Sequence, residues 1–275
     1  MQQSLIGMFR HINPVVLYPI VGVWILGYIL FVPSGTRGIW HYWTRRGVRR
    51  RAWNLYLNYL EFGKAILDRF AAYSGRAIRV KIEGEEILNR LNALPTGYIV
   101  LSSHIGNQEL AGYTFKPEKP MYVSIYLGDT ETVMGNRRRM FERHGLHVLP
   151  MRADGSHVVE MHNVLSDGNI LSIHADRLFY NSKCLRTPLL GEEAAYPEGP
   201  FRIAVAEGLP VVSLFFMRER MDTYTLYVRE LSDGQLPGRN KREQSEELLR
   251  RYVRTNEQML ERYPRQWFHF YEFWK

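Results

Sequence analysis

The feature that most constrains the fold is a series of short apolar runs that alternate with longer amphipathic segments. The runs have the length of single strands, whereas the segments between them carry apolar residues at three- and four-residue intervals, as helices do. The predicted strands are residues 78–83, 98–102, 121–126, 146–150, 169–174, 211–217 and 221–231. The predicted helices are residues 52–74, 84–94, 108–115, 132–144, 155–167, 199–208 and 241–262. Such alternation predicts an α/β fold with a mostly parallel central sheet flanked by helices.

Length and composition fit one large domain after a distinct N-terminal segment. The 275 residues are 45% hydrophobic, which is enough for a sizeable core. We find no internal repeat and no boundary after residue 75, so we expect a catalytic domain at residues 52–275, preceded by a segment of different character at 1–51. The single cysteine, Cys184, excludes a disulfide framework and a multi-cysteine metal site, and we expect no metal.

The N-terminal segment contains a long apolar stretch at residues 14–32. No charged residue lies between His11 and Thr36, and about 20 apolar residues suffice to span a bilayer. Five arginines follow, interleaved with aromatic residues: Arg45, Arg46, Arg49, Arg50 and Arg51. This pattern is typical of an anionic membrane surface, so we predict that residues 1–51 are a membrane anchor with a basic juxtamembrane segment and that the rest of the chain lies on the cytoplasmic side. The alternatives are a buried core helix and a nucleic-acid patch; no nucleic-acid-binding motif supports the second.

His104 and Glu109 are the most informative pair of titratable residues. They follow the apolar run 98–101, and four residues separate them. Positions five apart on one helix point roughly 140° away from each other, so the two side chains cannot converge there. They can converge if a strand ends at His104, the chain turns at Gly106, and a helix begins after Asn107. The pair is then a candidate general base with its orienting carboxylate, and a purely structural histidine is the alternative.

Two further groups of charged residues are candidates for substrate binding. Arg137, Arg138 and Arg139 lie on the predicted helix 132–144, where they could hold a phosphate or an acidic carrier, or form a solvated basic face. Asp176 and Arg177 directly follow the predicted strand 169–174. The carboxyl ends of parallel strands are where open α/β sheets place their ligands, which favours both residues as site residues.

Later segments complete a pattern that resembles a known superfamily. A Pro-Leu-Leu-Gly turn is followed by a helix that starts at a glycine, and near its end the sequence carries Gln-Trp and then a lysine. In order and spacing, residues from about 55 to 275 resemble the lysophospholipid acyltransferase superfamily, in particular its bacterial branch of lipid A biosynthesis (Lpx-type, lauroyl/myristoyl) acyltransferases. The matching residues are His104, Glu109, Asp176, Pro188, Gly191, Gly199, Ala204, Gly208, Pro210, Gln266, Trp267 and Lys275.

The resemblance implies a membrane-associated acyltransferase (EC 2.3.1.-) at the cytoplasmic face of the bacterial inner membrane, acting in lipid A and lipopolysaccharide biosynthesis. It would move a fatty acyl chain from acyl carrier protein or CoA to a hydroxyl or amine of a lipid. His104 would be the general base and Glu109 its orienting partner, as in the family's HX4E motif. Amides near Gly106, with Arg177 or an arginine of 137–139, would stabilise the oxyanion.

The same resemblance implies no cofactor beyond the thioester co-substrate and no nucleic-acid partner. The net charge of +8 suits the acidic carrier protein, the phosphates of CoA and an anionic membrane surface. The aromatic helix 52–74 could line an acyl groove, although ordinary core packing explains it equally well.

Departures from the family pattern leave the acceptor open. Residues 174–179 replace an Asp-rich, glycine-containing stretch of the Lpx branch, and residues 127–143 are richer in arginine. Acylation of another lipid, such as a lysophospholipid, an aminolipid or a pigment lipid, is therefore an alternative. A non-catalytic membrane scaffold with the same fold is a further one.

One segment imitates a site motif. Residues 196–202 resemble the Phe-Pro-Glu-Gly-Thr-Arg block of glycerolipid acyltransferases, which would assign Glu198 and Arg202 to the site. Their position along the chain is too late for that block. We therefore expect Asp176 and Arg177 to take its place.

Overall fold

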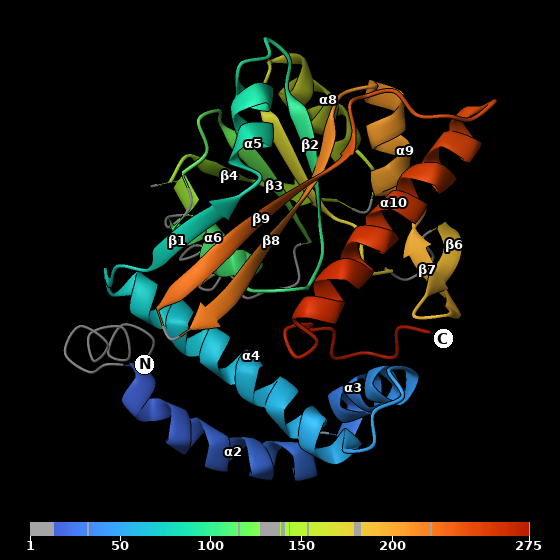
Figure 1. Ribbon diagram of the computed structural model, residues 1–275. Helices are drawn as coiled ribbons and strands as arrows, with labels where there is room; N and C mark the ends of the chain where they lie inside the picture. Colours follow the sequence, from blue (N-terminus) through green and yellow to red (C-terminus); the bar gives the residue numbers. More distant parts are fainter. Residues whose placement is uncertain are drawn as a thin grey trace.

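One mixed, mostly parallel sheet forms the centre of the molecule (Figure 1). The computed structural model describes residues 14–31, 33–114, 116–126, 138, 141–142, 144–152, 154–178, 183–220 and 222–274. Within these ranges, seven strands pair in the order β1-β9-β8-β2-β5-β3-β4. They are β1 (Arg79–Glu83), β2 (Tyr98–Ser102), β3 (Met121–Tyr126), β4 (Leu146–Met151), β5 (Ile170–His174), β8 (Val211–Arg220) and β9 (Thr223–Ser232). Only β8 and β9 pair antiparallel in this sheet, so the predicted α/β architecture is confirmed.

A separate antiparallel hairpin was not predicted from the sequence. Its strands are β6 (Cys184–Leu189) and β7 (Glu192–Pro197), and it packs beside α10. Residues of β6 alternate between exposed and buried, as in a strand with one face on the core. Arg186 and Pro188 interrupt the apolar pattern that would have marked this strand in the sequence.

Helices cover both faces of the sheet and its lower end. They are α2 (Tyr18–Phe31), α3 (Pro33–Arg45), α4 (Arg51–Tyr73), α5 (Glu85–Asn92), α6 (Gln108–Thr114), α8 (His157–Ser166), α9 (Glu198–Glu207) and α10 (Lys241–Arg262), after the short 3-10 turn η1 (Pro14–Leu17). The helices α8, α9 and α10 pack against one face, and α5 and α6 pack against the other. The long helix α4 contacts α2, α3 and α6, and thereby connects the N-terminal helices to the domain.

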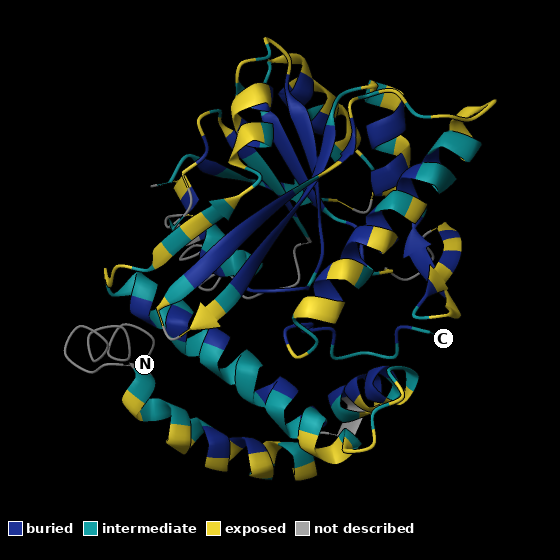
Figure 2. Cartoon of the chain, viewed as in Figure 1, coloured by how far each residue is buried: buried dark blue, intermediate teal, exposed yellow. Residues whose placement is uncertain are grey.

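Alternation along the strands divides the core into two clusters. In β2 all five residues are buried; Ile99 and Leu101 face the cluster under α9 and α10, whereas Tyr98 and Val100 face the one under α5 and α6. A central parallel strand is expected to be buried on both faces in this way. Figure 2 shows the central strands as buried and the outer helices as mixed.

The N-terminal apolar stretch ends at a bend between two helices, α2 and α3. Among the described residues no single helix is long and apolar enough to cross a membrane; only the pair Val15–Phe31 and Gly35–Arg45, bent by 99°, passes that test together. Pro33 begins α3, and a proline ends the helix before it because it lacks an amide hydrogen and restricts the residue that precedes it.

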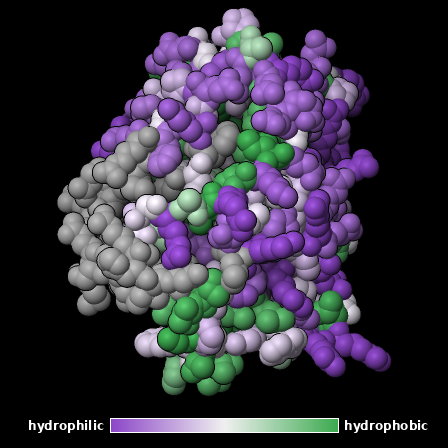
Figure 3. All heavy atoms as spheres, turned by 60° about the vertical axis from the view of Figure 1, so that its left-hand side comes forward, coloured by the Kyte–Doolittle hydropathy of each residue, from purple (hydrophilic) through white to green (hydrophobic). Residues whose placement is uncertain are grey.

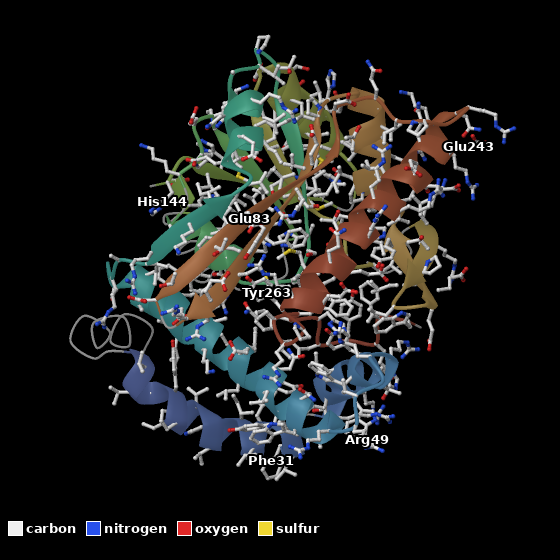
Figure 4. The ribbon with its side chains drawn as sticks, viewed as in Figure 1. Phe31, Arg49, Glu83, His144, Glu243 and Tyr263 are labelled. Atoms are coloured by element: carbon white, nitrogen blue, oxygen red, sulfur yellow. The ribbon has the colours of Figure 1, made fainter. Side chains whose placement is uncertain are left out.

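One side of α2 packs on α4, and the other side is apolar and exposed. The exposed apolar side chains of η1 and α2 are Val16, Ile20, Val23, Trp24, Leu26, Tyr28, Leu30 and Phe31. In Figure 3 hydrophobic atoms gather at the lower end of the molecule, where α2 lies. Phe31 points away from the body there, and Arg49 lies in the nearby loop between α3 and α4 (Figure 4).

A buried polar cluster ties α2 to the sheet. Asp68 on α4 accepts hydrogen bonds from the hydroxyl of Tyr18 at 2.9 Å and the hydroxyl of Tyr224 at 2.6 Å. Its carboxylate also accepts one from Nε of Arg218 at 3.0 Å. The cluster therefore fixes the start of α2 against β8 and β9.

Candidate active site

The loop after β2 is held by the C-terminal segment. Phe268 donates its backbone amide to the carbonyl of His104 at 2.9 Å, and the amide of Gly106 donates to the carbonyl of Gln266 at 2.7 Å. Between these two bonds, Ile105 forms an isolated bridge with Trp267. The Gln-Trp pair singled out in the sequence is thus a clamp on the His104 loop.

Gly106 makes the turn that the His-x4-Glu spacing required. Its φ is +82°, and a Cβ there would lie 2.6 Å from the carbonyl oxygen of Phe216, so only glycine fits. The carbonyl of Asn107 then accepts the amides of Leu110 and Ala111, which opens α6 with Glu109 in its first turn. The chain follows the predicted path of strand, turn and helix.

The imidazole of His104 is held by Asp176. Oδ1 of Asp176 lies 2.8 Å from Nδ1 of His104, and Oδ2 accepts the backbone amide of His104 at 2.6 Å. The two residues come from neighbouring parallel strands, since Ser102 and His174 are register partners at the ends of β2 and β5. The Asp176 side chain is only 2% exposed, whereas that of His104 is 26% exposed. Asp176 therefore positions the imidazole ring from beneath, and its own carboxylate is too buried to contact a substrate.

The charge state of Asp176 fixes the tautomer of His104. Burial raises the pKa of Asp176, but the adjacent His104 and its hydrogen bonds outweigh burial and hold that pKa at about 2. An ionised carboxylate can only accept, so Nδ1 of His104 carries the hydrogen. In the neutral ring, Nε2 is then the basic nitrogen.

Glu109 lies in the same site and forms an ion pair with Arg69. Its Oε2 accepts a hydrogen bond from Nη1 of Arg69, a residue of α4 that the sequence analysis did not single out. Both side chains are about one-fifth exposed. The role predicted for Glu109, to orient and polarise His104, stays a prediction; at Nδ1 that position is taken by Asp176.

A cavity of about 490 Å³ opens at His104 and runs under α6. Its polar lining surrounds the histidine and includes Arg69, Glu109, His174 and Arg177. The rest is mainly apolar: Phe62, Ala65, Ala111, Met121, Val123, Ile125, Phe141, Leu146, Leu214, Leu226, Phe268 and Phe270. Phe62 and Ala65 come from α4, as expected for a helix that could line an acyl groove.

His174 and Arg177 contribute a second imidazole and a cation. The ring centroids of His104 and His174 are 5.0 Å apart. Nη2 of Arg177 donates to the carbonyl of Phe268 at 3.4 Å, and its buried Nε has no partner among the described residues. The sequence showed His174 at a strand end, but nothing there indicated that β5 lies next to β2.

Three backbone amides of the turn at Gly106 already have hydrogen-bond acceptors. Gly106 and Asn107 donate theirs to Gln266 and Phe216, at 2.7 and 2.8 Å, and His104 donates its own to Asp176. The amides of Gly106 and Asn107 are therefore not free to bind an oxyanion, and an oxyanion role for other amides of this turn stays a prediction. The cation of Arg177 remains as a candidate for that role.

The structure describes only part of the predicted arginine run. Arg138 is helical and exposed, whereas Arg137 and Arg139 lie outside the described residues, as does Lys275. The imitation motif is away from the site. Glu198 begins α9, and its Oε1 lies 3.7 Å from Nη1 of Arg202. Neither residue is among the described residues that line the cavity.

Comparison with known proteins agrees with this geometry. A family model for bacterial lipid A biosynthesis acyltransferases matches residues 61–275, and the chain therefore belongs to this acyltransferase family. The predicted resemblance is confirmed. No curated protein matches the chain.

Proposed function

We propose that the protein transfers a fatty acyl chain from a thioester, carried by acyl carrier protein or CoA, to a hydroxyl or amine of a lipid acceptor, as in lipid A biosynthesis. The observation that carries the proposal is the pairing of His104 with a buried, ionised Asp176 at the mouth of an apolar cavity. This arrangement supplies a base next to a space suited to a hydrocarbon chain.

The proposed reaction needs no acyl-enzyme. Nε2 of His104 takes the proton of the acceptor hydroxyl while the acceptor oxygen bonds to the thioester carbonyl carbon. The carbonyl oxygen gains negative charge, which the cation of Arg177 stabilises. The C–S bond then breaks, and the thiolate leaves with the proton that His104 carries.

The N-terminal helices support a location at the inner membrane, with the domain on its cytoplasmic face. The exposed apolar side of α2 would enter the lipid, and the arginines that follow α3 would contact anionic headgroups. Arg45 is less suited to headgroups, because it pairs with Glu192 at 2.5 Å and lies over the ring of Trp274.

The decisive experiment compares His104→Gln with His162→Gln, since His162 is an exposed histidine on α8 that pairs with Glu207. With acyl carrier protein thioesters and a lipid A precursor, we expect His104→Gln to lose about 10³-fold in rate and His162→Gln to match the wild type. Full turnover by the His104 variant would overturn the mechanism.

The acceptor requires a separate measurement. Mass spectrometry of total lipids from a deletion strain should show the loss of one acylated species. A missing acyl chain on lipid A would support the proposed acceptor. Loss of an acylated phospholipid, aminolipid or pigment lipid would replace it, and an unchanged lipid profile would favour the non-catalytic scaffold.

A further inference from the structure

Two of the three buried serines that line the cavity are hydrogen-bonded to each other. Ser102, the last residue of β2, is 4% exposed, and Ser172 on β5 is 3% exposed. Both line the cavity, and their hydroxyl oxygens lie 3.2 Å apart. They come from the same adjacent strands that bring His104 and Asp176 together.

The pair leaves hydrogen-bonding capacity unused. Two hydroxyls carry two hydrogens, and the bond between them uses one. In the part of the chain that the structure describes, no other partner is found for either hydroxyl. The second hydrogen and the remaining lone pairs are therefore left for a group inside the cavity, because a buried hydroxyl without a partner is costly.

The serines lie between the reacting centre and the apolar end of the cavity. Ser172 precedes His174 by two residues on the same side of β5, which is roughly 6.6 Å along a strand. Beyond the serines the lining from β3 and β9 is mainly apolar, with Met121, Val123 and Leu226. Ser124 of β3 also lines the cavity, and its buried hydroxyl has no hydrogen-bond partner among the described residues. A chain whose carbonyl carbon sits at His104 would thus pass the serines within its first few carbons.

We infer that the cavity recognises an acyl donor whose chain carries a hydroxyl near its carboxyl end. The inference rests on the proposed function and names the substrate class of that site. The substrate hydroxyl accepts the free serine hydrogen and donates to a serine lone pair, while the rest of its chain fills the apolar part. An unsubstituted chain leaves the serine hydrogen unpaired, and the site discriminates against it for that reason.

The test compares 3-hydroxyacyl and unsubstituted acyl carrier protein thioesters of equal chain length. We expect wild-type kcat/KM to favour the hydroxylated donor about tenfold, and Ser172→Ala or Ser102→Ala to reduce that preference to about one. Ser213→Ala is the matched control: Ser213 is fully buried on β8 and donates to the carbonyl of Leu101, but it does not line the cavity.

The outcomes separate this inference from the proposed function. Turnover of both donors without preference, or an equal effect of Ser172→Ala on both, overturns the hydroxyl site and leaves acyl transfer intact. Absence of transfer from either donor overturns the proposed function and the inference with it. A preference that follows hydroxylation of the acceptor chain, with the donor held constant, reassigns the serine pair and overturns the donor assignment.

Discussion

Among the described residues, two carboxylates are almost completely buried, and they have different roles. Asp68 is 1% exposed and Asp176 is 2% exposed. The partners of Asp68 are a guanidinium and two phenol hydroxyls, which keep their hydrogens throughout the physiological pH range. The partner of Asp176 is an imidazole, the one side chain whose ordinary pKa lies near neutrality.

The comparison shows that burial alone does not mark a reactive carboxylate. The carboxylate of Asp68 accepts hydrogen bonds from donors on α2, β8 and β9, and these donors keep their hydrogens. The role of this cluster is therefore structural. Asp176 holds the imidazole ring of His104, a residue that lines the cavity. The identity of the partner and its access to the cavity distinguish the carboxylate that serves catalysis from the one that serves stability.

Asp176→Asn should give the largest effect on activity. The amide cannot hold His104 as an ionised carboxylate does, so we expect acyl transfer to fall about 10³-fold with the fold retained. Steady-state kinetics with circular dichroism would check this. In Asp68→Asn, activity per folded molecule should stay near the wild-type value; an equal loss in both variants would remove the distinction between the two carboxylates.

Asp68→Asn should instead give the larger loss of stability. Removing one partner of a buried ion pair leaves the guanidinium of Arg218 with only the more distant Glu61 as a charge partner, at 3.5 Å between Nη1 and Oε2, which costs about 3 kcal/mol. Urea unfolding would measure this difference. If Asp176→Asn were the less stable of the two, our description of the Asp68 cluster as the structural tie would fail.

The pH dependence of stability should distinguish Asp176 from an ordinary carboxylate. Its pKa of about 2 lies below the usual 3.8, so its contribution is fully present above about pH 4 and is lost as the pH falls through 2. Between pH 5 and pH 2, the wild type should lose about 2 kcal/mol more than Asp176→Asn. If the unfolding free energies of the two proteins depended on pH in the same way, this would contradict the depressed pKa of Asp176.

The smallest expected effect concerns the link to α2. Tyr18→Phe removes the hydrogen bond that Tyr18 donates to Asp68 and the one that it accepts from Nη2 of Arg218, and should cost about 1.5 kcal/mol of unfolding free energy. Hydrogen exchange should show faster opening of α2 while the rate of acyl transfer by protein in detergent is unchanged. Tyr28→Phe is a control on the same helix, because Tyr28 is half exposed and only its ring contacts Tyr59.

The sequence predicted the elements of the sheet well because their signals are local. Buried strands such as β2 and β5 are short apolar runs, and the turn at Gly106 follows from the incompatibility of His104 and Glu109 on one helix. The hairpin β6–β7 was missed because its strands lack an apolar run. The bend between α2 and α3 was not predicted, although Pro33 marks its position in the sequence.

The site could be predicted only in part, because its geometry depends on strand order. His104 and Asp176 were both identified, but their pairing requires β5 to lie beside β2, and nothing in the local pattern specifies that neighbour. Arg69 comes from α4, far along the chain from Glu109. Ser102 and Ser172 look like ordinary strand residues until the cavity that they line is known.

The bond between His104 and Asp176 has a consequence for folding. It joins residues that are 72 positions apart in the sequence. The chain between them forms β3 and β4, which lie on the side of β5 that faces away from β2. Parallel pairings at such separation form late, since the loop entropy is lost before the contacts compensate for it. During refolding, recovery of acyl-transfer activity should therefore lag behind recovery of the helical circular dichroism signal. The return of activity would report when the sheet is complete.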